Sequence, residues 1–125
     1  MIDQPAIDAA RVEHLRALGG APFVTEMVRL FRGFAAEQLA LLERAVATGD
    51  RPGAARRAHA IRSSAMNVGA RAVQALAGAI EANATGDDAA TLVERAADLR
   101  TAVLAAAGVL AGLADARATT PGAET

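Results

Sequence analysis

Among the side chains of this sequence, histidine is best suited to group transfer at neutral pH, because a neutral imidazole carries a nucleophilic nitrogen. The chain has 2 histidines and no cysteine. In a helix, Arg62 and Ser63 would lie next to His59, one turn further on. An arginine there would stabilise a phosphoryl group on the ring, and the small serine would leave the ring accessible. The spacing fits phosphoryl transfer on His59, but one histidine beside an arginine is a weak signal, and from spacing alone an ordinary polar surface histidine is favoured.

The segment that carries His59 is predicted to be a helix from about Pro52 to Asn67, with Gly69 as its stop. At about 100° per residue, His59 lies roughly 140° from the centre of the apolar stripe of this helix. We therefore expect His59 to be exposed or at a boundary. The residues predicted to form that stripe are Ala54, Ala58, Ile61, Ala65 and Val68.

Four further helices are predicted around this segment. Glycine pairs and turn residues end them, at Gly19-Gly20, at Thr48-Gly49-Asp50 and at Thr85-Gly86. They cover about residues 7–18, 22–47 and 70–84, and a last stretch that runs from a cap at Asp87 or Asp88 to about 117. On the long second segment, the apolar spacing predicts a buried stripe of Phe23, Met27, Leu30, Phe34, Leu41 and Ala45, widened by Val24, Phe31 and Leu42.

The composition favours an all-α fold. The chain has 125 residues, 53% of them hydrophobic, and lacks Tyr and Trp, which suits closely packed alanine-rich helices. Short connections make successive helices antiparallel, so we expect an up-down four-helix bundle with a short additional N-terminal helix as a lid. The predicted domain covers residues 1–117. Residues 118–125, which include Pro121 and Gly122, are predicted to be a disordered tail.

Charge and hydropathy disfavour several classes of function. The 13 basic residues, all arginine, are spread along the chain against 14 acidic ones, which argues against nucleic-acid binding. The apolar run at residues 102–111 is shorter than the about 20 residues that span a bilayer, so we expect no membrane insertion and a cytoplasmic location. Asp87 and Asp88 resemble a helix cap, not a metal site, and His14 resembles a surface residue.

The segment from His59 to Gly69 resembles the signature of histidine phosphotransfer (HPt) domains. Residues 15–20, 23–31 and 47–50 also resemble this family, so the likeness covers roughly residues 7–113. Two positions depart from the usual pattern, because HPt domains usually have Gly where Ser63 stands and more often Lys than Arg at position 62. The matching residues are His59, Ile61, Arg62, Ser64, Ala65, Val68 and Gly69.

The resemblance implies a phosphocarrier without kinase activity of its own. His59 would shuttle a phosphoryl group between aspartates of receiver domains, those of a hybrid histidine kinase and of a response regulator. The resemblance implies no cofactor and no metal site in this chain, with Mg²⁺ supplied by the partner receiver. We expect the protein to be a monomer.

The resemblance also assigns roles around His59. Arg62 would act on the phosphoryl group, and Glu81, where family members often have Glu or Gln, would bond the other ring nitrogen. The alternative for Glu81 is a solvated residue near a helix end. The residues expected to give access to the ring or to dock the partner are Ala55, Arg56, Ala60, Ser63, Met66 and Asn67.

Two other functions stay open at this point. A non-catalytic helical adaptor would bind a receiver or kinase and inhibit transfer, and Ser63 is the feature that could favour it. An enzyme that used His59 and Glu81 as acid and base would need a concave pocket around them.

Overall fold

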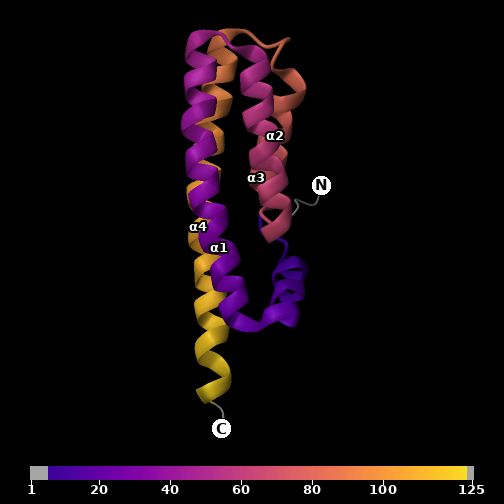
Figure 1. Cartoon of the computed structure of the whole chain (residues 1–125), viewed down its shortest axis with the longest axis vertical. Helices are drawn as coiled ribbons and strands as arrows, with labels where there is room; N and C mark the ends of the chain where they lie inside the picture. Colours follow the sequence, from indigo (N-terminus) through magenta and orange to yellow (C-terminus); the bar gives the residue numbers. More distant parts are fainter. Residues whose placement is uncertain (1–5, 124–125) are drawn as a thin grey trace.

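The computed structural model describes the backbone of residues 6–123 and the side chains of residues 6–115. Four helices follow one another: α1 (Ala9–Thr48), α2 (Arg51–Val68), α3 (Arg71–Asn83) and α4 (Ala89–Ala123). Contacts join α1 to α2 and α4, and α3 to α2 and α4, so the helices form a four-sided antiparallel bundle (Figure 1). The predicted all-α, up-down bundle is confirmed.

A kink divides α1 at Gly20, whose φ of 78° is left-handed and favours glycine. Residues 9–19 form a short helix that lies beneath the ends of α2 and α3 (Figure 1). A Cβ on Gly19 would come within 2.5 Å of the Phe23 side chain, so the chain needs glycine there as well. Pro22 follows in the first turn of the long helix, where its missing N–H costs little. The predicted lid helix and its stop at the glycine pair are confirmed.

Glycine and aspartate caps fix the ends of α2. The side chain of Asp50 accepts a hydrogen bond of 2.9 Å from the Gly53 N–H at the first turn. Gly69 ends the helix with a φ of 76°, and a Cβ there would lie 2.9 Å from the Asp8 carbonyl oxygen. The tight turn at Gly69 makes α2 and α3 adjacent and antiparallel. The five residues predicted to form the core face of α2 are all buried: Ala54, Ala58, Ile61, Ala65 and Val68.

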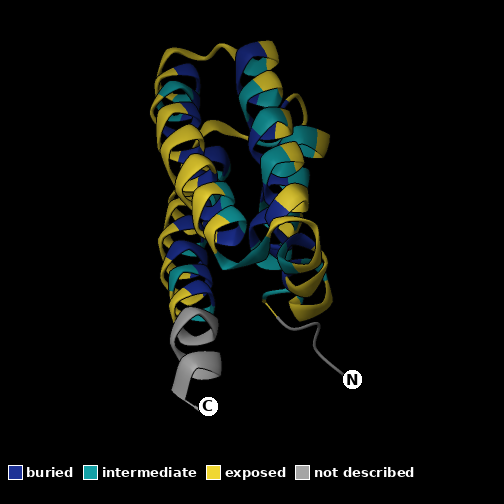
Figure 2. Ribbon diagram, turned by 60° about the horizontal axis from the view of Figure 1, so that its bottom comes forward, coloured by how far each residue is buried: buried dark blue, intermediate teal, exposed yellow. Residues whose placement is uncertain are grey.

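The predicted stripe of α1 is wrong at Leu30 and Phe34, whose relative exposures are 49% and 40%. Apolar residues follow more than one row along this helix, so spacing alone does not select the inward row. In the structure Val28 and Ala35 face the core instead, and the alanine allows a close helix approach. Figure 2 shows the buried stripe along each helix. The buried residues of the long part of α1 are Val24, Val28, Phe31, Ala35, Gln38, Leu39, Leu42 and Ala45.

The helix α4 is longer and more apolar than expected. It continues to Ala123, so residues 118–123 are helical where the sequence predicts disorder; residues 124–125 lie outside the described ones. Extending an existing alanine-rich helix needs no new nucleation, which favours this outcome. Between Ala89 and Asp115 the helix is long and apolar enough to cross a membrane by length and composition, because few charges interrupt it. Its inward residues Leu99, Val103 and Leu110 belong to the bundle core.

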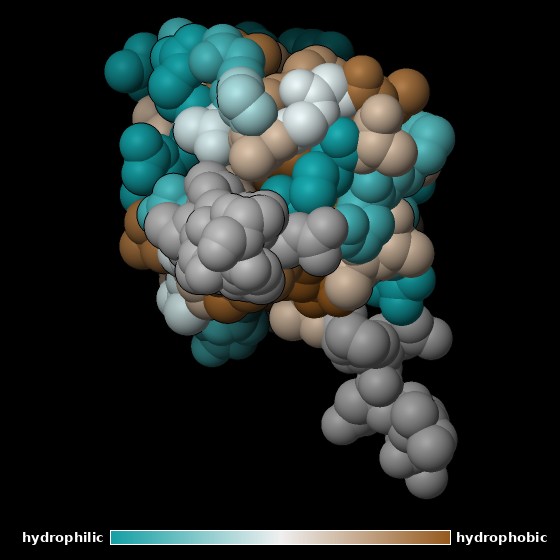
Figure 3. Space-filling model, turned by 90° about the horizontal axis from the view of Figure 1, so that it is seen from below, coloured by the Kyte–Doolittle hydropathy of each residue, from teal (hydrophilic) through white to brown (hydrophobic). Residues whose placement is uncertain are grey.

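Polar and apolar residues lie side by side at the end of the bundle near the two termini. Seen from below in Figure 3, hydrophilic and apolar side chains alternate among the coloured residues of this face.

Candidate functional site

His59 lies on the outer side of α2, opposite the buried Ala58 and Ile61. Its side chain is 55% exposed. The ring is therefore accessible to a partner, as the helical wheel predicts. The other histidine, His14, is exposed on the short lid segment of α1.

A carboxylate on the neighbouring helix binds the ring. Nδ1 of His59 lies 2.8 Å from Oε2 of Glu81 on α3. A carboxylate only accepts hydrogen bonds, so Nδ1 donates its proton in this pair. In the neutral ring the lone pair then belongs to Nε2, the nitrogen suited to nucleophilic attack.

Arg62 contacts the same carboxylate. Its Nε donates a hydrogen bond of 3.0 Å to Oε1 of Glu81, while Oε2 accepts from His59. Glu81 is 30% exposed and Arg62 38% exposed, so the pair is partly screened from water. The three side chains form one chain of contacts from α2 to α3 and back to α2.

An apolar groove lies between α1 and α2, on one side of His59. Its volume is about 520 Å³. The exposed side chains of Leu30 and Phe34, which the sequence assigned to the core, line it from α1. We call this site the apolar groove. From α2 it is lined by Ala60, Ser63, Ser64, Asn67 and Val68, and from α1 by Met27, Leu30, Phe31 and Phe34.

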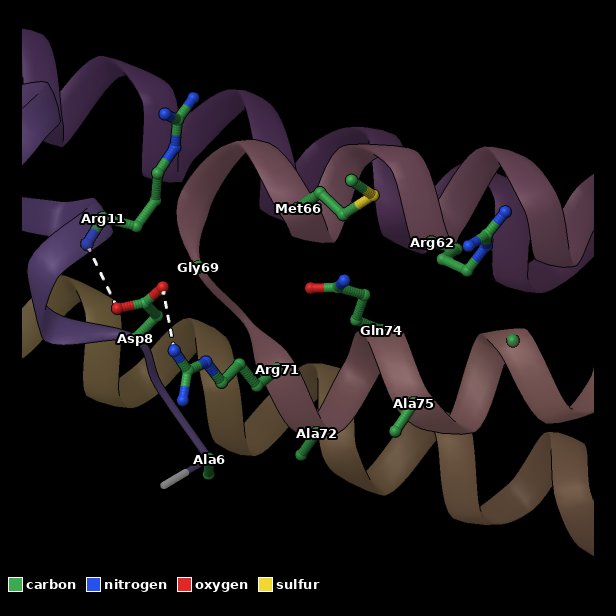
Figure 4. Close-up of a pocket in the computed structure, with 11 residues that line it drawn as sticks. Ala6, Asp8, Arg11, Arg62, Met66, Gly69, Arg71, Ala72, Gln74 and Ala75 are labelled. Atoms are coloured by element: carbon green, nitrogen blue, oxygen red, sulfur yellow. Dashed lines mark hydrogen bonds and ion pairs between the residues drawn. The ribbon is translucent and has the colours of Figure 1, made fainter. Parts of the chain in front are cut away.

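A second groove lies between α2 and α3, on the other side of His59, with a volume of about 900 Å³. Three arginines and Met66 line it, the arginines from three different segments, and Gln74 lies between α2 and α3 (Figure 4). We call it the arginine groove. An ion pair of 3.2 Å between Arg71 and Asp8 crosses one end of it. The arginines are Arg11, Arg62 and Arg71.

The residues predicted for access and docking divide between these two sides. Ala60, Ser63 and Asn67 line the apolar groove, and Met66, 49% exposed, lines the arginine groove. The remaining two, Ala55 and Arg56, line neither groove; Ala55 is half-buried and Arg56 is exposed.

Two contributions to the site were missed from the sequence. Leu30 and Phe34 were assigned to the core, and their place at every third or fourth position of α1 gave no sign of exposure. Arg11 reaches the groove lined by Arg71 only because the lid segment folds back onto the α2–α3 turn, where the Asp8 N–H donates to the Gly69 carbonyl at 2.7 Å. This fold-back of the lid segment depends on the kink at Gly20, and no residue spacing in the sequence predicts it.

The bundle and its histidine define a class of protein: a helical bundle with an accessible imidazole whose Nδ1 is bound by a carboxylate of the next helix. Residues 26–116 match the family model described as Hpt domain, and the chain belongs to the Hpt domain family. His59 and Glu81 lie inside the matched region. The protein is therefore a histidine phosphotransfer protein of two-component signalling, a family that works with receiver domains and histidine kinases in phosphorelays.

A solved structure supports the same fold. Histidine-containing phosphotransfer protein B (HptB) from Pseudomonas aeruginosa PAO1 matches with a TM-score of 0.77 and 17% sequence identity, over 90% of this chain and 97% of that chain. At this identity the likeness shows the fold. No curated protein sequence matches the chain.

Proposed function

We propose that His59 receives a phosphoryl group from the aspartyl phosphate of one receiver domain and passes it to the aspartate of another. The donor would be the receiver of a hybrid histidine kinase and the acceptor a response regulator. The observation that carries the proposal is the 2.8 Å contact between Nδ1 of the exposed His59 and Glu81, which leaves Nε2 as the nucleophile.

In the transfer step, one bond to phosphorus forms and one breaks. The lone pair of Nε2 attacks phosphorus, an N–P bond forms, and the P–O bond to the donor aspartate breaks, so that its carboxylate leaves. The proton on Nδ1 stays on the ring, which becomes a positively charged phosphoimidazolium. Glu81, 2.8 Å from Nδ1, lies where its negative charge offsets that positive charge. The reverse step returns the group to an aspartate.

We propose that the partner receiver supplies the divalent cation of this reaction. Among residues 6–115, no group of three or more His, Cys, Asp or Glu side chains is placed to hold a metal ion. When bound in the acidic pocket of a receiver, Mg²⁺ would neutralise charge on the phosphoryl oxygens. We assign no kinase activity to this chain and propose a phosphocarrier that acts as a monomer in the cytoplasm.

The apolar groove is proposed as the docking side for the receiver. Leu30 and Phe34 are exposed beside Ser63, which follows His59 by one helical turn. Exposed apolar side chains around small residues suit a partner that packs closely next to the ring. Ala60 and Asn67 extend the same surface along α2.

The test is incubation with a phosphorylated receiver. The wild-type chain should gain phosphate that is labile in acid and stable in alkali, whereas His59→Gln should fold normally and gain none. A His14→Gln variant is the matched control and should transfer like the wild type. An adaptor would bind the receiver and gain no phosphate, and that result, or phosphorylation that persists in His59→Gln, would overturn the proposal.

A further inference from the structure

The lid segment of α1, residues 9–19, supplies a cation to the C-terminal end of α2. The last turn of α2 has no basic residue of its own. Instead, Nε of Arg11, which lies 56 positions away in the sequence, donates a hydrogen bond of 3.0 Å to the Asn67 carbonyl oxygen. The last carbonyls of a helix lack partners within the helix and carry partial negative charge, so a cation there stabilises the final turn.

This contact is made where the lid packs directly on the end of α2. The carbonyls of Ala65 and Met66 accept from N–H groups of the turn that follows α2, whereas the carbonyl of Asn67 accepts from the distant lid. A Cβ at Gly69 would lie 3.0 Å from Cβ of Arg11, so the two backbones are close together (Figure 4). The close approach fixes the place from which the arginine reaches the helix end.

The same last turn forms one end of the apolar groove. Asn67 and Val68 line this groove, and Ser63 and Ser64 line it one turn earlier. Arg11 lines the arginine groove, on the other side of α2. Its hydrogen bond to the Asn67 carbonyl therefore connects the lid, through the backbone of α2, to the surface proposed to bind the receiver.

We propose that Arg11 is a positioning residue that couples the lid segment to receiver binding in the apolar groove. With its carbonyl anchored, the last turn of α2 presents Asn67 and Val68 in one arrangement. Without the anchor the turn frays, and only part of the molecules present the binding surface. The proposal rests on the proposed docking side, and it gives Arg11 no part in the chemistry at His59.

The first test separates affinity from chemistry. Arg11→Met removes the donor and keeps most of the aliphatic stem. It should raise the Kd for a receiver domain that phosphorylates the chain by about threefold to tenfold, the range for one hydrogen bond, with the transfer rate at saturating receiver unchanged. Arg11→Lys should recover part of the affinity, because an ammonium group still donates to a carbonyl. Arg29→Met is the matched control and should leave the Kd unchanged, since Arg29 donates to Glu26 of its own helix and lines neither groove.

Linkage gives a second test on the wild-type chain. If docking of the lid raises the affinity for the receiver, receiver binding must stabilise lid docking by the same factor. The Asp8 N–H, which donates to the Gly69 carbonyl at 2.7 Å, reports lid docking from outside the apolar groove. Its hydrogen exchange should slow by about threefold to tenfold at saturating receiver. Exchange of the Gly53 N–H, which is bonded to Asp50 at the opposite end of α2, is the control and should not change.

Three outcomes overturn the proposal. They are an unchanged Kd in Arg11→Met, an equal rise of the Kd in Arg29→Met, and an exchange rate of the Asp8 N–H that receiver binding leaves unchanged. Failure of the proposed docking side would look different, because Phe34→Asp would then leave the Kd at the wild-type value. If far-UV circular dichroism shows that Arg11→Met does not fold, the exchange measurement on the wild type decides.

Discussion

The two grooves beside His59 differ in chemistry although the same helix forms one wall of each. On the α1 side, Leu30 and Phe34 give an apolar surface; on the α3 side, Glu81 binds both Arg62 and the ring. Residues one, four and eight positions after His59 face the first groove, and those three and seven positions after it face the second. The difference fits the proposed division of labour, in which the apolar side binds the partner and the polar side prepares the ring.

Among changes in the two grooves, the largest effect should come from a bulky side chain at the border between the ring and the apolar groove. Ser63 lines that groove one turn from His59, so Ser63→Phe should fill the approach and lower transfer by more than about a hundredfold. Ser63→Gly should transfer at least as fast as the wild type. Rates of phosphate gain from a phosphorylated receiver measure both. Normal transfer by the Phe variant would mean that the partner does not approach over this groove.

A smaller effect is expected on the polar side. Glu81→Ala removes the acceptor of the Nδ1–H and should slow the transfer step by about tenfold to a few hundredfold, near the low end for a group that only orients the ring. Glu81→Gln should be mild, because the amide oxygen still accepts. Single-turnover rates at saturating receiver isolate this step. If Glu81→Ala instead weakened binding and left the saturated rate intact, the assignment of the two sides would be reversed.

A change on the apolar side should alter the affinity for the receiver. Phe34→Asp places a charge on the docking surface and should raise the Kd for the receiver by about tenfold, or about 1.4 kcal/mol, with the saturated transfer rate unchanged. Leu104→Asp is the matched control, since Leu104 is 65% exposed on α4 and lines neither groove. Equal affinities of the two variants would exclude Phe34 from the interface. Calorimetric titration gives the Kd.

The smallest effect concerns a face away from both grooves, where Arg100 of α4 donates two hydrogen bonds of 2.7 Å to Glu43 of α1. These hydrogen bonds lower the pKa of Glu43 from 4.5. A lowered pKa in the folded state stabilises the fold above the unfolded pKa, and this contribution is lost as the pH falls through the folded value. Because both groups are more than a third exposed, Arg100→Ala should cost under about 1 kcal/mol at pH 7.

Urea unfolding of the wild type and Arg100→Ala at pH 7 and at pH 3 checks this sign. The difference between them should shrink at the lower pH, while transfer at neutral pH stays equal. A difference that grows on acidification would show that the pair stabilises the fold in some other way.

Much of the fold could be predicted because local signals agree with the tertiary structure. Gly49, Gly69 and the Gly20 kink all have positive φ where the sequence places helix ends. The stripe of α2 has a single apolar row, so its period selects the buried face and hence the exposure of His59. The same period on α1 was ambiguous, because Leu30 and Phe34 continue an apolar row that the bundle leaves outside.

The sequence predicts which residues lie near His59 better than it predicts the contacts between them. His59 and Glu81 come from the motif and from its spacing to the next helix. The hydrogen bond from Arg62 to Glu81 depends on a side-chain rotamer and on the space at Gly78, which neither propensity nor spacing encodes. The arginine groove depends on the lid segment folding back onto α2, a long-range contact.

The position of the phosphoryl group on the imidazole tests the central claim most directly. After transfer from a receiver, ¹H–³¹P and ¹⁵N NMR of the phosphorylated chain identify both the residue and the nitrogen that is modified. With Nδ1 bound by Glu81 at 2.8 Å, the group should be on Nε2 of His59. A phosphoryl group on Nδ1 of His59, or on any other residue, would contradict the account.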